Sequence, residues 1–180
     1  KLRLSQTVMM ASDKKSRILR ILHMVLLILK YRNKLGLVLI DTYSTMAFFY
    51  AFFSGLTAHF LGIPFIPVLH GGCLPSRIKK SPGITNLFFS NAAVNMSPSR
   101  FLIKKLNHYG WNLLHIPNFI DLNHYPYQHR KKLQPRLLWV RSFHKIYNPQ
   151  MAVRALYHIL ERYPQAFLTM VGPNKDGSLF

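Results

Sequence analysis

Residues 35–69 read LGLVLIDTYSTMAFFYAFFSGLTAHFLGIPFIPVL, and the alternation of short and long apolar runs in this stretch decides the fold class. The run at 35–40 is short, continuous and partly β-branched, as is typical of a strand buried in a parallel sheet. Residues 42–61 are long enough for a helix, which Gly62-Ile63-Pro64 ends before a second short apolar run at 65–69. Strand, helix and strand in this order predict a βαβ unit.

The alternation of predicted strands and helices continues on both sides of this stretch. Upstream, apolar residues recur at helical spacing and predict a helix over 17–29. Downstream, the pattern predicts strands at 92–96, 112–116, 137–140 and 166–171, and helices at 100–108 and 149–163. The fold class expected from this order is α/β with parallel sheets.

The connection over 117–136 separates two candidate domains, because its composition turns to Asn, His, Tyr, Pro and Lys. We expect a Rossmann-like domain over 1–120 and the beginning of a second one over 121–180. The second would hold one strand–helix–strand unit, too little to enclose a core of its own. The absence of an initiating Met at Lys1 and the end of the chain soon after a strand lead us to expect that both ends are cut.

The charge balance points to anionic partners. The chain has 24 Lys and Arg against 5 Asp and Glu, a formal net charge of +19. Nucleic acid, an anionic membrane face and phosphorylated substrates would all be attracted to it. The basic residues are dispersed along the sequence, which disfavours a nucleic-acid-binding module.

Between Asp41 and Arg77 the sequence carries no formal charge, and residues 44–63 are about long enough to cross a bilayer. Gly55, Thr57 and His59 interrupt this run, so we interpret it as a helix buried between two strands. Attachment to a membrane surface is then favoured over a membrane-embedded protein.

Candidate site residues follow the predicted strands, because open parallel sheets bind ligands at the carboxyl ends of their strands. His70-Gly71-Gly72 combines an imidazole with two glycines that let a ligand approach the backbone. Arg141 and Lys145 follow the first strand of the second domain and suit a diphosphate. Gly172, with Pro173 and Gly177-Ser178, could bring backbone amides close to an anion. The alternatives are a structural histidine and solvated basic loops.

Other chemistries find little support in the sequence. Glu161 is the sole glutamate and there are four aspartates, so no carboxylate pair is spaced for acid–base catalysis. The nine histidines form no metal-binding spacing, and no metal site is expected. The single cysteine, Cys73, cannot form an internal disulfide, which fits a reducing compartment. No companion acid is evident that would make it a nucleophile beside His70.

Several motifs taken together resemble the core of retaining glycosyltransferases of family 4. In chain order they are IPNFID at 116–121, LLWVR at 137–141, Asn148-Pro149, Tyr163-Pro164 and LTMVGP at 168–173. The family has a PN-G-I-D turn, a VGR…K segment and a P…L-x-I-V-G-x-G-P strand in the same order. The chain departs from this pattern at Phe119 and Val140, which replace glycines, and the Arg-to-Lys spacing is one residue shorter.

The resemblance implies a GT-B fold with two Rossmann-like domains, the second only partly present. It implies transfer of a hexosyl group, with retention, from a nucleotide diphosphate sugar to a saccharide or lipid-linked acceptor in cell-surface polysaccharide synthesis. Arg141 matches the family's donor-phosphate arginine, Lys145 its lysine, and His70 a histidine near the transferred sugar. Gly71 and Gly72 would lie on the acceptor side and Gly172 on the donor side.

The resemblance further implies that the paired catalytic glutamates lie beyond Phe180, so we expect the chain as given to be inactive. No cofactor other than the nucleotide sugar is expected, and no nucleic-acid partner. We expect a cytoplasmic protein bound peripherally to the anionic inner face of a membrane. A basic nucleic-acid-binding protein and a membrane-embedded protein, both without catalysis, are the alternatives.

Overall fold

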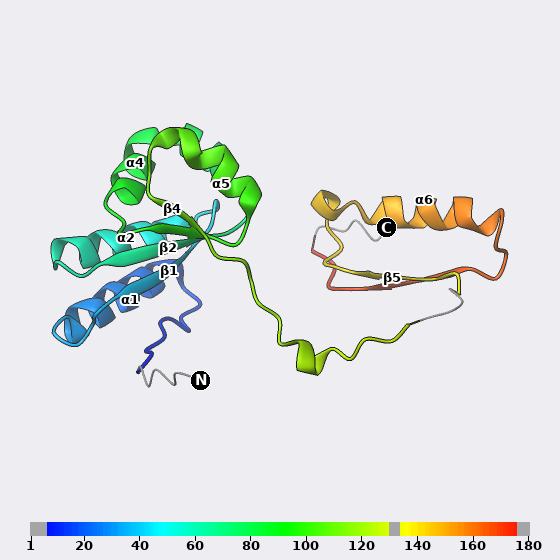
Figure 1. Cartoon of the computed structure of the whole chain (residues 1–180), viewed down its shortest axis with the longest axis horizontal. Coiled ribbons are helices and arrows are strands. Elements are labelled where there is room, and N and C mark those ends of the chain that lie inside the picture. The colour runs from blue at the N-terminus through cyan, green and yellow to red at the C-terminus, as the bar shows by residue number, and fades with distance from the viewer. Residues whose placement is uncertain (1–6, 130–133, 176–180) are drawn as a thin grey trace. The chain divides into compact units, whose positions relative to one another are not determined.

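The computed structural model describes residues 7–129 and 134–175. The chain divides into two compact units, Lys1–Ile120 and Asp121–Phe180 (Figure 1). Each unit contains a parallel sheet, with several helices around it in the first unit and one α-helix among the described residues of the second, so the expected α/β class with parallel sheets is confirmed.

The first unit is built on a four-stranded sheet in the order β1-β2-β3-β4 with every pair parallel. Its strands are β1 (Val38–Thr42), β2 (Phe65–Leu69), β3 (Asn95–Ser97) and β4 (Leu113–His115). Its helices are α1 (Arg17–Tyr31), α2 (Phe48–Phe60), α3 (Leu74–Lys80), α4 (Pro82–Ser90) and α5 (Arg100–Leu106), followed by a 3-10 turn (Asn107–Tyr109). Because the strands are parallel, their carboxyl ends lie at one edge of the sheet.

Helix α2 packs closely on strands β1 and β2 and against α1. A Cβ atom at Gly55 would lie 2.5 Å from the ring of Phe88 and 2.8 Å from that of Phe65. Glycine therefore allows the helix to approach an aromatic core in which Phe48, Phe65 and Phe88 are fully buried. The expected helix between two strands is present and packs on the core, while Phe53 and Phe60 on its other side are exposed. Within the described ranges, no helix has the length and apolar character needed to cross a bilayer.

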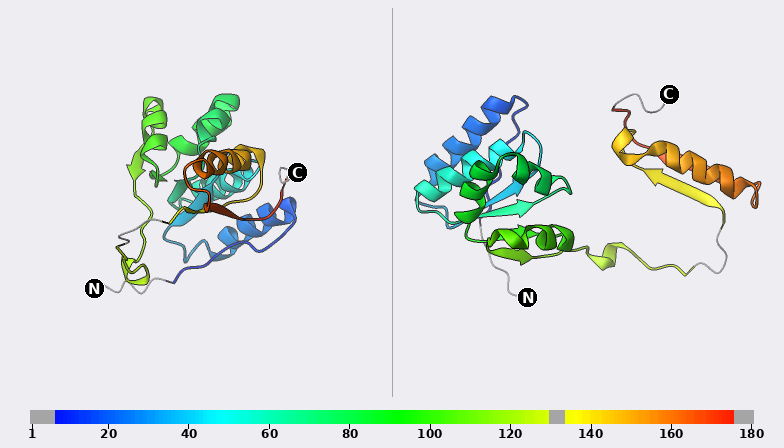
Figure 2. Two further views of the ribbon diagram at one scale, coloured as in Figure 1. Left: turned by 90° about the vertical axis from the view of Figure 1, so that its right-hand side faces the viewer. Right: turned by 90° about the horizontal axis from the view of Figure 1, so that it is seen from above.

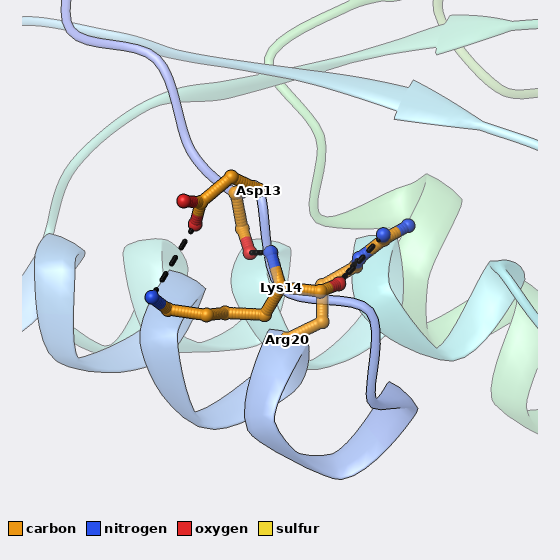
Figure 3. A network of polar contacts seen from close by, with 4 residues as sticks. Asp13, Lys14 and Arg20 are labelled. Carbon is orange, nitrogen blue, oxygen red and sulfur yellow. Dashed lines mark hydrogen bonds and ion pairs between the residues drawn. The ribbon is translucent and has the colours of Figure 1, made fainter.

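Helix α1 holds the chain that precedes it. The Arg20 guanidinium donates from Nε and Nη2 to the carbonyl of Lys14 at 2.9 and 2.7 Å, and the Lys14 ammonium lies 3.6 Å from the Asp13 carboxylate (Figure 3). The same guanidinium lies 5.5 Å from the ring centroid of Tyr50 on α2. Arg20 thus links the N-terminal segment, α1 and α2.

The second unit contains β5 (Arg136–Val140), α6 (Pro149–Leu160) and β6 (Phe167–Val171), with 3-10 turns at Leu122–His124 and Lys145–Tyr147. The two strands are parallel and in register from Arg136 with Phe167 to Val140 with Val171. Figure 2 shows α6 alongside this pair and the helices of the first unit around its sheet.

Exposure alternates along both strands of the second unit. One face of the ladder is half-buried, and α6 packs on β6. The other face leaves apolar side chains in solvent, with exposed fractions of 70% at Leu138 and 61% at Val140. The second unit by itself therefore covers one face of its sheet only in part.

Some element boundaries differ from those expected from the sequence. Strand β1 runs on through Asp41 and Thr42, which pair with Val68 and Leu69, and α2 accordingly begins at Phe48. Strand β3 was expected to begin at residue 92, but it begins three residues later, at Asn95. Helices α3 and α4, each of which contains a proline, were not expected from the sequence. Both prolines occupy the first turn, where a missing N–H costs no hydrogen bond.

Candidate functional site

The ends of β1 and β2 bring two sequence-distant loops together in the first unit. The backbone N–H of His70 donates to the carbonyl of Thr42 at 2.9 Å, extending the ladder by one bond beyond the strands. Tyr43 and His70 follow their strands at this point, and their rings stack with centroids 5.0 Å apart and planes 19° apart.

A carboxylate completes this arrangement. His70 Nε2 lies 3.0 Å from Asp41 Oδ1, and the exposed fraction is 28% for the imidazole and 69% for the carboxylate. An ionised carboxylate only accepts, so Nε2 carries the hydrogen that it donates to Oδ1. We call Asp41, Tyr43 and His70 the His70 cluster.

The glycines after His70 leave open space beside the cluster. Gly71 has a φ of +84°, a left-handed conformation that glycine adopts without a Cβ penalty. A Cβ atom at either Gly71 or Gly72 would meet no heavy atom within 4 Å. Cys73 follows them and is exposed. The loop can therefore admit a ligand close to its backbone.

In the second unit, Arg141 follows β5 directly. Its backbone N–H donates to the carbonyl of Val171 at 3.0 Å, so the start of this loop is fixed by the ladder. The Arg141 side chain is exposed, and its guanidinium lies 4.8 Å from the ring centroid of Tyr147. This contact restricts the guanidinium while leaving its edge available to an anion.

Lys145 lies in the turn between Arg141 and α6. It begins the 3-10 turn Lys145–Tyr147, which is capped by His144 Nδ1 accepting from the N–H of Ile146 at 3.1 Å. Asn148 then adopts a left-handed conformation with a φ of 48°, and Pro149 begins α6. The loop that carries both cations is thus anchored at each end.

Gly172 has a structural reason for being glycine. A Cβ atom there would lie 1.5 Å from the carbonyl oxygen of Arg141, which no side chain could tolerate without a backbone shift. The close approach continues the β5–β6 pairing, since Phe143 N–H donates to the Pro173 carbonyl at 2.9 Å. Gly172 therefore lies against Arg141. Gly177 and Ser178, which the sequence grouped with it, lie outside the described residues.

The structure brings two residues to the candidate site that the sequence did not assign. Asp41 and Tyr43 were recognisable only as polar residues after a strand. Their pairing with His70 depends on β1 and β2 being neighbours in register, which apolar periodicity does not reveal.

Across 7–129 and 134–175 no group of three or more His, Cys, Asp or Glu side chains could hold a metal ion. A surface hollow near the N-terminus contains none of the candidate residues and is lined by Met10, Ala11, Ser12, Asp13, Lys14 and His23.

Comparison of the chain with protein-family models and with curated proteins gives no match. The function is therefore inferred from residues, geometry and charge.

Proposed function

We propose that the protein is a retaining glycosyltransferase of GT-B type that transfers a sugar from a nucleotide diphosphate sugar to a saccharide or lipid-linked acceptor. The second unit binds the donor through Arg141, with Lys145 and the backbone at Gly172. The first unit binds the acceptor side through His70 and the glycines Gly71 and Gly72.

One observation carries this proposal: the candidate residues of each unit follow the carboxyl ends of parallel strands. His70 follows β2, Arg141 follows β5 and Gly172 follows β6. Ligands of open α/β sheets bind at this edge, where loops present side chains and backbone amides.

The chemistry of Arg141 suits a diphosphate. Its planar guanidinium can donate to two phosphate oxygens at once, and the stacked ring of Tyr147 reduces the freedom lost on binding. Gly172 lies against the Arg141 backbone, so the backbone after β6 adjoins the loop that carries this guanidinium.

The positive charge of the chain supports binding to ligands and surfaces that carry phosphate groups. A net charge of +19 favours both an anionic donor and an anionic membrane surface. We infer peripheral attachment to the cytoplasmic face of a membrane.

Calorimetric titration of the 180-residue chain tests the proposal. A panel of nucleoside diphosphates should bind saturably at one site, at least about tenfold tighter than the matching monophosphates, because a second phosphate adds charge-assisted hydrogen bonds of about 1.5–3 kcal/mol each. Equal weak binding of both classes would contradict the proposal. Steeply salt-dependent binding of duplex DNA without saturable nucleotide binding would favour the nucleic-acid alternative instead.

A further inference from the structure

We propose that α1 docks the protein on an anionic lipid bilayer by inserting its outer apolar side between the lipid headgroups. Peripheral attachment to a membrane is part of the proposed function, on which this inference rests, and α1 is the surface that attaches. Donor binding plays no part in this docking, so the two are tested separately.

Helix α1 is apolar on both of its sides. Residues 18–29 read ILRILHMVLLIL, in which Arg20 and His23 are the polar residues. One side packs on α2 at the margin of the first unit and contributes Ile28 to the core (Figure 1). The side that faces solvent is also aliphatic, where a surface helix ordinarily presents polar residues.

The exposed aliphatic residues of α1 form one continuous surface, which we call the α1 stripe. Its members are Ile18, Leu19, Leu22, Leu26 and Leu29, with exposed fractions between 37% at Leu29 and 71% at Ile18. Four of them follow one another at intervals of four, four and three residues, which places them along one face of the helix. An exposed apolar surface of this kind, bordered by charge, is typical of a protein or membrane interaction site.

Cations border the α1 stripe at both ends. The exposed ones are Lys14, Lys15 and Arg17 where the helix begins, and Lys30, Arg32 and Lys34 where it ends. Asp13 is the only acidic residue up to Ile40, and its carboxylate lies 3.6 Å from the Lys14 ammonium. Long basic side chains can lie along apolar surface and place their charge at the level of lipid phosphates. The border of the stripe is therefore complementary in charge to an anionic headgroup layer.

The composition of this surface favours lipid over a protein partner. The centres of protein interfaces are enriched in aromatic residues and arginine and are poor in lysine. The α1 stripe is wholly aliphatic, and lysines make up most of its border. Leucine on one side of a helix and lysine or arginine beside it are typical of helices that lie in the headgroup region of a bilayer.

The length and packing of α1 determine how it would lie. Its 15 residues extend over about 22 Å, which is shorter than the hydrocarbon core of about 30 Å. Its inner side is held on α2, where the Arg20 guanidinium lies 5.5 Å from the ring centroid of Tyr50. Helix α1 would therefore lie parallel to the membrane plane, with the stripe inserted and the cations among the headgroups.

The first test is sedimentation of the 180-residue chain with vesicles of phosphatidylcholine and phosphatidylglycerol at low ionic strength. Leu22→Ser combined with Leu26→Ser keeps every charge and changes two half-exposed side chains. Binding should weaken at least about tenfold, because less apolar surface leaves water on insertion. Leu22→Met combined with Leu26→Met keeps the stripe apolar and should stay within about threefold.

The matched control is Leu138→Ser combined with Val140→Ser, which changes exposed apolar side chains of the second unit. This control should stay within about twofold of the unsubstituted chain. A second measurement needs no substitution: a nitroxide-labelled lipid in bicelles of the same composition broadens the NMR signals of amides near it. We expect the broadening to be concentrated at 17–31.

Several results would overturn the inference. Unchanged vesicle binding of the Leu22→Ser, Leu26→Ser protein, or an equal loss in the control, would each do so. Broadening centred on 136–140 and 167–171, or self-association through the α1 stripe without vesicle binding, would do so as well. The Leu22→Ser, Leu26→Ser protein should bind nucleoside diphosphates like the unsubstituted chain, so failure of the donor site and failure of the membrane surface are observed in separate experiments.

Discussion

The side chain of Arg141 is exposed to solvent, but its position is restrained. Its backbone is bonded to Val171 and its guanidinium lies over Tyr147, so the charge is held where β5 ends. Other exposed cations such as Lys79, Lys104 and Lys105 lie on helix surfaces, where their charge is screened at physiological salt. Arg141 is therefore the residue on which the proposed donor site depends most.

Replacement of Arg141 by Ala should weaken nucleotide diphosphate binding roughly ten- to a hundredfold, because a charge-assisted hydrogen bond contributes about 1.5–3 kcal/mol. Arg141→Lys should recover only part of this loss, since an ammonium lacks the planar fork. The measurement is calorimetric titration with the tightest-binding nucleoside diphosphate.

Arg162 provides the matched control for Arg141. It is also exposed and also lies over a tyrosine, 5.9 Å from the ring centroid of Tyr163. Arg162→Ala should keep the affinity within about twofold. Equal losses of affinity at the two positions would show that binding depends on the general positive charge of the chain and not on Arg141 in particular.

Substitution of Gly172 tests whether the loop after β5 depends on the pairing of β5 with β6. Gly172→Ala would force a Cβ atom onto the carbonyl of Arg141, and the resulting shift should destabilise the second unit by about 1–3 kcal/mol or more. Amide hydrogen exchange over 136–140 and 167–171 should speed up accordingly. Gly36→Ala, where a Cβ atom meets nothing within 4 Å, should leave exchange at these strands unchanged. Unchanged exchange in Gly172→Ala would refute the close approach.

At the scale of elements, the packing of α2 on the sheet depends on Gly55. Gly55→Ala gains up to about 1 kcal/mol of helix propensity but pushes into the buried rings of Phe65 and Phe88, which costs about 1–3 kcal/mol. We expect a lower denaturation midpoint, monitored by the fluorescence of Trp111, whose ring stacks on Tyr109 and lies 4.8 Å from that of Phe89.

Gly83→Ala is the helical control for this substitution. Gly83 lies in the first turn of α4, and a Cβ atom there meets nothing within 4 Å. It should leave the midpoint unchanged or raise it slightly. A Gly55→Ala protein as stable as Gly83→Ala would show that α2 does not pack as closely as described.

The sequence predicted elements with clear end signals well and the short helices that contain proline poorly. Strand β2 matches its expected range, and β5, β6 and α6 differ from theirs by a few residues, because each combines an apolar pattern with clear end signals. Helices α3 and α4 were not predicted, because each is short and has a proline in its first turn. Periodicity identifies elements but not which strands are neighbours, so the contact between Asp41 and His70 could not be predicted.

At the scale of the whole molecule, the excess of positive charge should govern where the protein binds. We expect the chain to bind vesicles containing phosphatidylglycerol at low ionic strength and to be released as salt rises toward 1 M, where the screening length falls to about 3 Å. Vesicles of phosphatidylcholine alone are the control and should bind little. Sedimentation of protein with vesicles measures both, and equal binding to the two would contradict a charge-driven attachment.

The proposed function depends above all on binding of a nucleotide diphosphate sugar at the carboxyl ends of β5 and β6. Mapping the amide shifts of the 180-residue chain by NMR, as a nucleotide diphosphate sugar is added, tests it most directly. We expect saturable shifts concentrated at 141–147 and 172–175, abolished by Arg141→Ala and retained by Arg162→Ala. Shifts spread over the basic residues of both units, without saturation, would contradict it.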